Sequence, residues 1–159
     1  MLRTPSKYIE TSGKVNGGGD VAAKKSYPMI PATVWWKLRE QFQKTIPGTV
    51  TRTYLATVLG VNERTAGNLL GPLRTVGLID KEGKPTERAN HWRFDDDYAS
   101  VCKEILEEVY PEELRHAVPD PKVNREGALR WFMKTAGVGE AGANKMVATY
   151  QLLVDATPK

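Results

Sequence analysis

The sequence has one cysteine, two histidines and no long hydrophobic run. A single cysteine cannot close an internal disulfide, so the disulfide-stabilised class of small secreted domains is excluded. No apolar segment approaches the roughly 20 residues that a membrane-spanning helix needs. The N-terminal stretch MLRTPSKYIETSGKVNGGGD is polar and lacks the apolar region of a secretory signal peptide. These absences predict a cytoplasmic protein that does not contact a membrane.

Residue patterns that carry catalysis are also missing. His91 and His116 stand alone, and no H-E-x-x-H, C-x-x-C, P-loop or G-x-S-x-G pattern occurs. Carboxylates gather between residues 94 and 114, but no candidate metal-binding histidine accompanies them, so a solvated acidic face is the simpler interpretation. We predict that the protein is not an enzyme and uses no cofactor or metal.

Charge is distributed unevenly along the 159 residues, whose formal net charge is +4. Residues 44–93 contain eight basic and four acidic side chains, whereas residues 94–114 contain one basic and eight acidic ones. A basic region of this kind favours a polyanionic partner at one face. Solvated faces that differ in sign by chance would give the same pattern.

Two helical patterns flank Gly60 in the stretch LATVLGVNERTAGNLLGPLRTVGLI. Glycine accepts the left-handed conformation that ends a helix in a tight turn, and Asn62 is a good N-cap for the helix that follows. Apolar residues at helical spacing continue to Val76, with a bend expected at Gly71-Pro72. The pattern predicts a helix-turn-helix.

The next segment, GLIDKEGKPT, predicts a short strand, a turn at Glu82-Gly83 and a short return. Thr86 then begins another helix. Because the return is short, we expect a short β-wing after the helix-turn-helix.

Further helices are expected on both sides of this unit. One follows Pro31 and ends before Pro47-Gly48, one covers 97–109 with Cys102 on its buried stripe, and two follow Asn124 and Gly137. The predicted fold is mainly α, with a winged helix-turn-helix core, a short β-wing and a C-terminal helical subdomain. The expected divisions are a flexible basic tail (1–26), a winged-helix-like domain (27–93) and the helical subdomain (94–159).

The second half of the chain repeats part of the helix-turn-helix pattern at an offset of 77 residues. At this offset Gly60 aligns with Gly137, Ala66 with Ala143, and both stretches have the form G-V-x-E-x-x-A followed by apolar pairs. The shared needs of any short helix corner explain the likeness more simply than gene duplication does.

The stretch from Leu55 to Ile79 resembles winged helix-turn-helix domains, which implies a second helix that reads DNA. More broadly, residues 27–156 resemble a prokaryotic protein family of unknown function, through YPMIP, GLIDKEGKPT, YPEEL and AGVGEAGANKMVATYQLL. That resemblance supports the order of elements and implies no activity.

The leading functional hypothesis is a DNA-binding module, such as a transcriptional regulator or an accessory factor, that recognises double-stranded DNA. Arginine pairs with guanine and asparagine with adenine in the major groove, whereas other basic side chains contact phosphates. The expected base-reading residues are Asn62, Arg64, Thr65 and Asn68, and the expected phosphate contacts are Arg52, Lys81, Lys84, Arg88 and Arg93.

The alternative is a protein–protein interaction adaptor that uses the winged-helix and acidic-helix surfaces, with a protein partner or a second copy of the chain. Glu63 begins the expected recognition helix and would repel phosphates, and residues 94–114 offer a surface for a basic partner.

Overall fold

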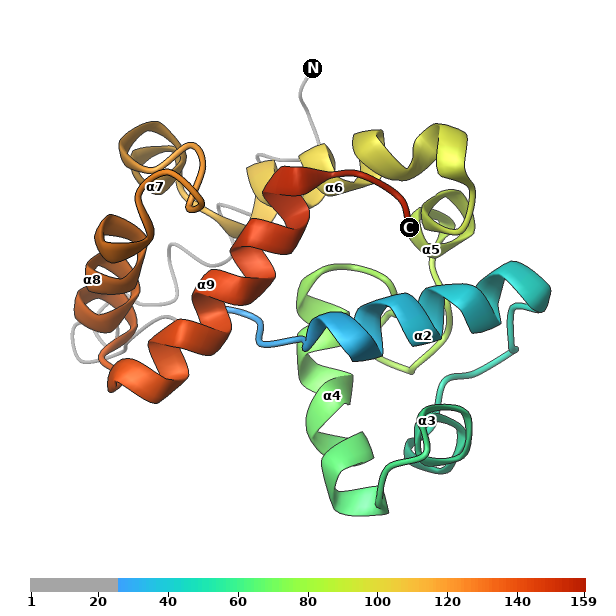
Figure 1. The fold of residues 1–159 in the computed structure, drawn as a ribbon. Helices are drawn as coiled ribbons and strands as arrows, with labels where there is room; N and C mark the ends of the chain where they lie inside the picture. The colour runs from blue at the N-terminus through green and yellow to red at the C-terminus, as the bar shows by residue number, and fades with distance from the viewer. Residues whose placement is uncertain (1–25) are drawn as a thin grey trace.

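The computed structural model describes residues 26–159, which form eight α-helices and no β-strand (Figure 1). Their bounds are α2 (Ala32–Lys44), α3 (Arg52–Leu59), α4 (Glu63–Thr75), α5 (Glu87–Trp92), α6 (Asp95–Val109), α7 (Glu112–Ala117), α8 (Arg125–Ala136) and α9 (Glu140–Asp155). Helices α2, α3 and α4 lie at one end of the molecule, α7 and α8 lie at the other, and α6 and α9 lie between them. The mainly α class is confirmed. The predicted flexible tail lies outside the described residues, apart from Ser26.

The core contains two groups of aromatic side chains. Near α2, the ring of Trp92 packs edge-on against Trp35 and Phe42, at centroid distances of 5.0 and 5.7 Å. At the other end, Tyr110 stacks on Tyr27 at 5.6 Å and packs against Tyr150 at 4.9 Å. Burial of these large aromatic surfaces stabilises the fold at both ends.

The predicted helix-turn-helix is present as α3, a short turn and α4. Thr51 caps α3 by accepting a hydrogen bond from the Tyr54 backbone N–H, and Asn62 caps α4 by accepting one from the Thr65 N–H at 2.8 Å. Gly60 ends α3 at φ 71° and ψ 36°, which is the left-handed conformation that favours glycine. Ala66 is fully buried where the two helices meet. Local sequence signals therefore fix this corner.

Helices α8 and α9 form a second corner, and the glycine that ends its first helix has the same backbone conformation as Gly60. Gly137 ends α8 at φ 68° and ψ 35°, and its N–H bonds to the Met133 carbonyl at 3.0 Å, as that of Gly60 bonds to the carbonyl of Ala56 at 3.0 Å. Ala143 occupies the buried place of Ala66. The 77-residue offset thus relates two similar helix corners in space.

The predicted β-wing is wrong, because residues 78–86 form a closed turn with a single antiparallel bridge between Ile79 and Pro85. The backbone N–H of Asp80 bonds to the Lys84 carbonyl, and the side chain of Asp80 accepts from the Lys84 N–H at 2.9 Å, so the turn closes at once. Pro85 has no N–H to extend a ladder. Thr86 already caps α5. These constraints leave no room for two strands.

Helix α6 contacts both ends of the molecule. Its first turn meets α2, where Arg39 bonds to Asp95 at 2.9 Å and the Trp35 indole donates to the Tyr98 hydroxyl at 2.8 Å. Its other contacts include α5 and α9. The hydrophobic core is continuous across residues 93 and 94, where the sequence suggested a boundary. Within the described residues, none of the helices combines the length and apolar character needed to cross a membrane.

We predict that Arg39→Met lowers the free energy of unfolding by about 2–4 kcal/mol, because it leaves the buried Trp92 carbonyl without its donor and removes the cation over the Tyr98 ring. Asp95→Asn is the control, since that carboxylate is exposed and its loss should cost at most about 1 kcal/mol. Urea unfolding of both variants measures the difference. Equal losses would contradict the assigned role of Arg39.

We predict that Cys102 reacts slowly in the folded protein. The side chain is fully buried on α6, as the sequence indicated, and this burial raises the pKa of its thiol to about 11. Alkylation near neutral pH should be roughly 100-fold slower than in denaturant, because the thiolate is the reactive form. Rapid alkylation of the folded protein would show that the α6 face is open.

Candidate nucleic-acid interface

The outward face of α4 carries the side chains that the sequence assigned to base reading. Asn62, Arg64, Thr65 and Asn68 are all exposed, whereas Ala66 on the opposite face is buried. The Asn62 carboxamide oxygen is engaged in the cap, which leaves its amide nitrogen for an external acceptor. The helix therefore exposes a polar strip of side chains, and the burial of its opposite face holds the helix backbone in place.

Arg64 lies at the centre of this strip. Across residues 26–159 its side chain makes no hydrogen bond or ion pair, and neither does the side chain of Asn68. The neighbouring Glu63 accepts a hydrogen bond from the Thr53 hydroxyl at 3.2 Å. This bond ties the acidic side chain to α3. The guanidinium of Arg64 consequently remains available to a ligand.

Three of the predicted phosphate contacts are also exposed. Lys81 and Lys84 lie on the turn after α4, where Lys84 faces Glu82 at 3.8 Å with 61% of its side chain exposed. Hydrogen bonds from backbone N–H groups, led by that of Lys84, lower the pKa of Asp80 and hold the turn in shape. Arg52 begins α3 and lies against α4 at Gly67. Arg52 therefore precedes α4 in the chain, and Lys81 and Lys84 follow it.

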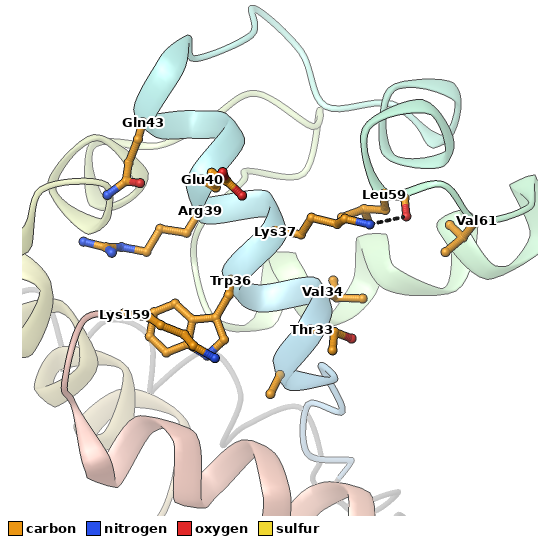
Figure 2. Close-up of a pocket in the computed structure, with 11 residues that line it drawn as sticks. Thr33, Val34, Trp36, Lys37, Arg39, Glu40, Gln43, Leu59, Val61 and Lys159 are labelled. Atoms are coloured by element: carbon orange, nitrogen blue, oxygen red, sulfur yellow. Dashed lines mark hydrogen bonds between the residues drawn. The ribbon is translucent and has the colours of Figure 1, made fainter.

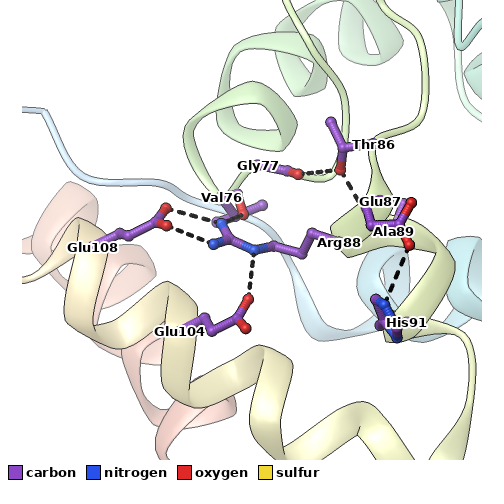
Figure 3. A network of polar contacts seen from close by, with 9 residues as sticks. All are labelled: Val76, Gly77, Thr86, Glu87, Arg88, Ala89, His91, Glu104 and Glu108. Carbon is purple, nitrogen blue, oxygen red and sulfur yellow. Dashed lines mark hydrogen bonds and ion pairs between the residues drawn. The ribbon is translucent and has the colours of Figure 1, made fainter. Parts of the chain in front are cut away.

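The other two predicted phosphate contacts serve the fold. Arg88 extends from α5 toward α6 and pairs with Glu108 at 2.6 Å and Glu104 at 3.3 Å, with 14% of its side chain exposed (Figure 3). It also donates to the Val76 carbonyl at 3.0 Å. Arg93 donates to the Phe42 carbonyl at 2.8 Å and lies over the ring of Phe94. Both guanidinium groups are committed to internal contacts.

A groove of about 700 Å³ runs along the outer side of α2 (Figure 2). Trp36 lines it and packs against Tyr98 at 5.5 Å, and the aliphatic residues Val34 and Val61 lie on the side toward α3 and α4. Lys37, which also lines the groove, donates to the Leu59 carbonyl at 3.4 Å. Trp36 is half-buried, whereas the neighbouring Trp35 is fully buried in the core.

The described residues hold no group of three or more histidine, cysteine or acidic side chains that could bind a metal ion. The arrangement on α4 offers hydrogen-bond donors, an amide and cations. These groups suit recognition of a polar anionic surface.

The fold and this surface define a helical protein built on a helix-turn-helix corner with an exposed polar face. The chain belongs to the family of unknown function DUF5343, whose model matches residues 29–157. No curated protein and no solved structure is significantly similar to the chain.

We predict that Arg88→Gln lowers the free energy of unfolding and leaves the affinity measured for duplex DNA unchanged. Its carboxylate partners are about half exposed, so the loss of free energy of unfolding should be about 1–2 kcal/mol. Duplex affinity at fixed salt should change less than about twofold, because this guanidinium faces α6. Denaturant unfolding and fluorescence anisotropy on the same variant separate the two effects. A large loss of affinity for duplex DNA in a folded Arg88→Gln protein would show that Arg88 contacts DNA, as the sequence predicted.

Proposed function

We propose that this protein is a DNA-binding module that uses the α3–α4 helix-turn-helix to contact double-stranded DNA, as a transcriptional regulator or an accessory factor does. The observation that carries the proposal is the exposed strip of α4, in which Arg64 and Asn68 have no partner among the described residues. Exposed side chains with paired donors and acceptors on a rigid helix are the means by which proteins read base edges.

The roles follow from side-chain chemistry. Arg64 presents a planar fork that matches the two acceptors of guanine, and Asn68 offers a donor and an acceptor suited to adenine. Thr65 and the amide nitrogen of Asn62 lie at the same end of α4 and supply further polar contacts. Arg52, Lys81 and Lys84 contact phosphates and fix the orientation of α4 on the duplex.

A protein–protein interaction adaptor is the second candidate. The groove on α2 supports it, because a partly exposed tryptophan beside aliphatic side chains is typical of protein interfaces. The acidic segment supports it less, because Glu104 and Glu108 are paired with Arg88 inside the protein.

Titration of duplex binding with salt tests the proposal directly. A DNA-binding protein loses affinity linearly in log–log form as salt rises, with a slope set by the number of phosphates it neutralises. Random duplex at low salt is a sufficient first probe, since phosphate contacts do not need a defined sequence. Absence of binding at low salt would overturn the proposal in favour of the adaptor.

We predict that Arg64→Ala costs about 1–3 kcal/mol of binding free energy at a selected site and reduces the preference for that site over random duplex. Lys84→Ala is the matched control. It should weaken binding to both duplexes alike and lower the salt slope by about one, as expected for a lost phosphate contact. Both affinities are measured at two salt concentrations.

Unchanged affinities in a folded Arg64→Ala protein would contradict the base-reading role of α4. The side chain would then be an exposed arginine of little energetic consequence.

A further inference from the structure

Gly67 lies inside α4, where glycine is an unfavourable residue. A glycine inside a helix destabilises the helix by up to about 1 kcal/mol relative to alanine. The other glycine of this helix, Gly71, precedes Pro72, where a residue without a Cβ lets the helix continue. Gly67 has no such local reason. It lies in the middle of the helix that the proposed function places against DNA.

The side chain of Arg52 occupies the space beside Gly67. A Cβ at position 67 would lie 3.0 Å from the Arg52 Nε, 3.2 Å from its Cζ and 3.3 Å from one terminal nitrogen. The guanidinium of Arg52 thus packs beside Gly67 of α4, so closely that a Cβ at this position would require the guanidinium to shift by a few tenths of an ångström. The Arg52 side chain is exposed and forms no ion pair or hydrogen bond within residues 26–159.

We propose that Arg52 and Gly67 form a preorganised phosphate seat, in which the missing side chain of Gly67 positions the Arg52 guanidinium to bind a backbone phosphate of duplex DNA. This inference rests on the proposed function and extends it. An arginine side chain normally loses much rotamer freedom when it binds, and a side chain that already packs against a neighbouring helix loses less. Its planar donors match the geometry of two phosphate oxygens.

The position of the seat favours phosphate over base recognition. Arg52 is the first residue of α3, at the positive end of that helix, and its guanidinium lies at the border between α3 and α4. Arg64 and Asn68 occupy the outward strip of α4 itself. A duplex held by that strip would bring its sugar-phosphate backbone to the flank where Arg52 rests. The seat therefore contributes affinity and orientation without sequence preference.

Gly67→Ala tests this inference because its effects on folding and on binding have opposite signs. The substitution should raise the melting temperature by about 2–4 °C through better helix propensity. It should lower the affinity for selected and random duplex alike by about 2- to 5-fold, because the added Cβ displaces Arg52. Arg52→Ala should lower both affinities by about 10-fold and reduce the salt slope by about 0.9.

The double variant Arg52→Ala/Gly67→Ala is the matched control. It should bind as Arg52→Ala alone does, because without the guanidinium the alanine has nothing to displace. Nitrogen-15 relaxation of the Arg52 Nε in the free protein gives a readout that does not depend on DNA. That group should be ordered in the wild type and more mobile in Gly67→Ala.

Three results distinguish the ways in which the ideas fail. If Gly67→Ala leaves both affinity and Arg52 order unchanged, or if its loss persists when Arg52 is absent, the phosphate seat is overturned while the proposed function stands. If Arg52→Ala is neutral but Arg64→Ala is not, the seat alone is again overturned. If the wild type shows no salt-dependent binding to duplex, the proposed function and the seat are both overturned.

Discussion

The arrangement of the helices depends on one buried cation. The Arg39 side chain, on α2, is 2% exposed, yet its guanidinium donates to the Trp92 carbonyl at 2.7 Å, to Asp95 at 2.9 Å, and lies 4.6 Å from the centre of the Tyr98 ring. A charge so buried is tolerated only when its donors are satisfied. Meeting this requirement fixes the end of α5 and the start of α6 against α2. Because α2 also packs on α3, these contacts help to position the helix-turn-helix relative to α5 and α6.

The packing of α5 on α6 accounts for part of the uneven distribution of charge along the sequence. The sequence placed a basic segment beside an acidic one and suggested external partners for each. In the structure, part of this charge is paired across the α5–α6 interface, where Arg88 pairs with two glutamates and His91 hydrogen-bonds to Asp97 at 3.1 Å. The hydrogen bond to Asp97 raises the pKa of His91. Three cations of the basic segment, Arg52, Arg64 and Lys81, form no ion pair within residues 26–159, and they lie on α3, on α4 and in the turn that follows α4.

The two helix corners share a turn but differ in what they present to solvent. At the 77-residue offset, Gly139 stands in place of Asn62, Ala141 in place of Arg64, and Gly142 in place of Thr65. Small residues therefore replace three of the four proposed base-reading side chains in the second corner. The shared geometry reflects the packing needs of two helices joined by a left-handed glycine. The difference in surface residues is the reason that the proposed function is assigned to α3–α4 alone.

Local chemistry in the sequence determined most of the helices and the helix-turn-helix. Thr51, Gly60 and Asn62 act within a few residues of themselves, so their capping roles could be predicted, as could the buried face that contains Cys102. The prediction of a wing was wrong, because the hydrogen bond to Asp80 and the bridge at Pro85 close the turn before a second strand can form.

The site was predictable only in part, for a related reason. Exposure of Arg64 and Asn68 follows from helical periodicity, which is written in the sequence. The pairing of Arg88 with Glu108, the hydrogen bond from Arg93 to Phe42 and the packing of Arg52 beside Gly67 each join residues that are 15 or more positions apart. Contacts over such separations arise only when the helices pack. The sequence by itself therefore determined which cations the protein has, and the tertiary structure decided which of them remain free to bind a partner.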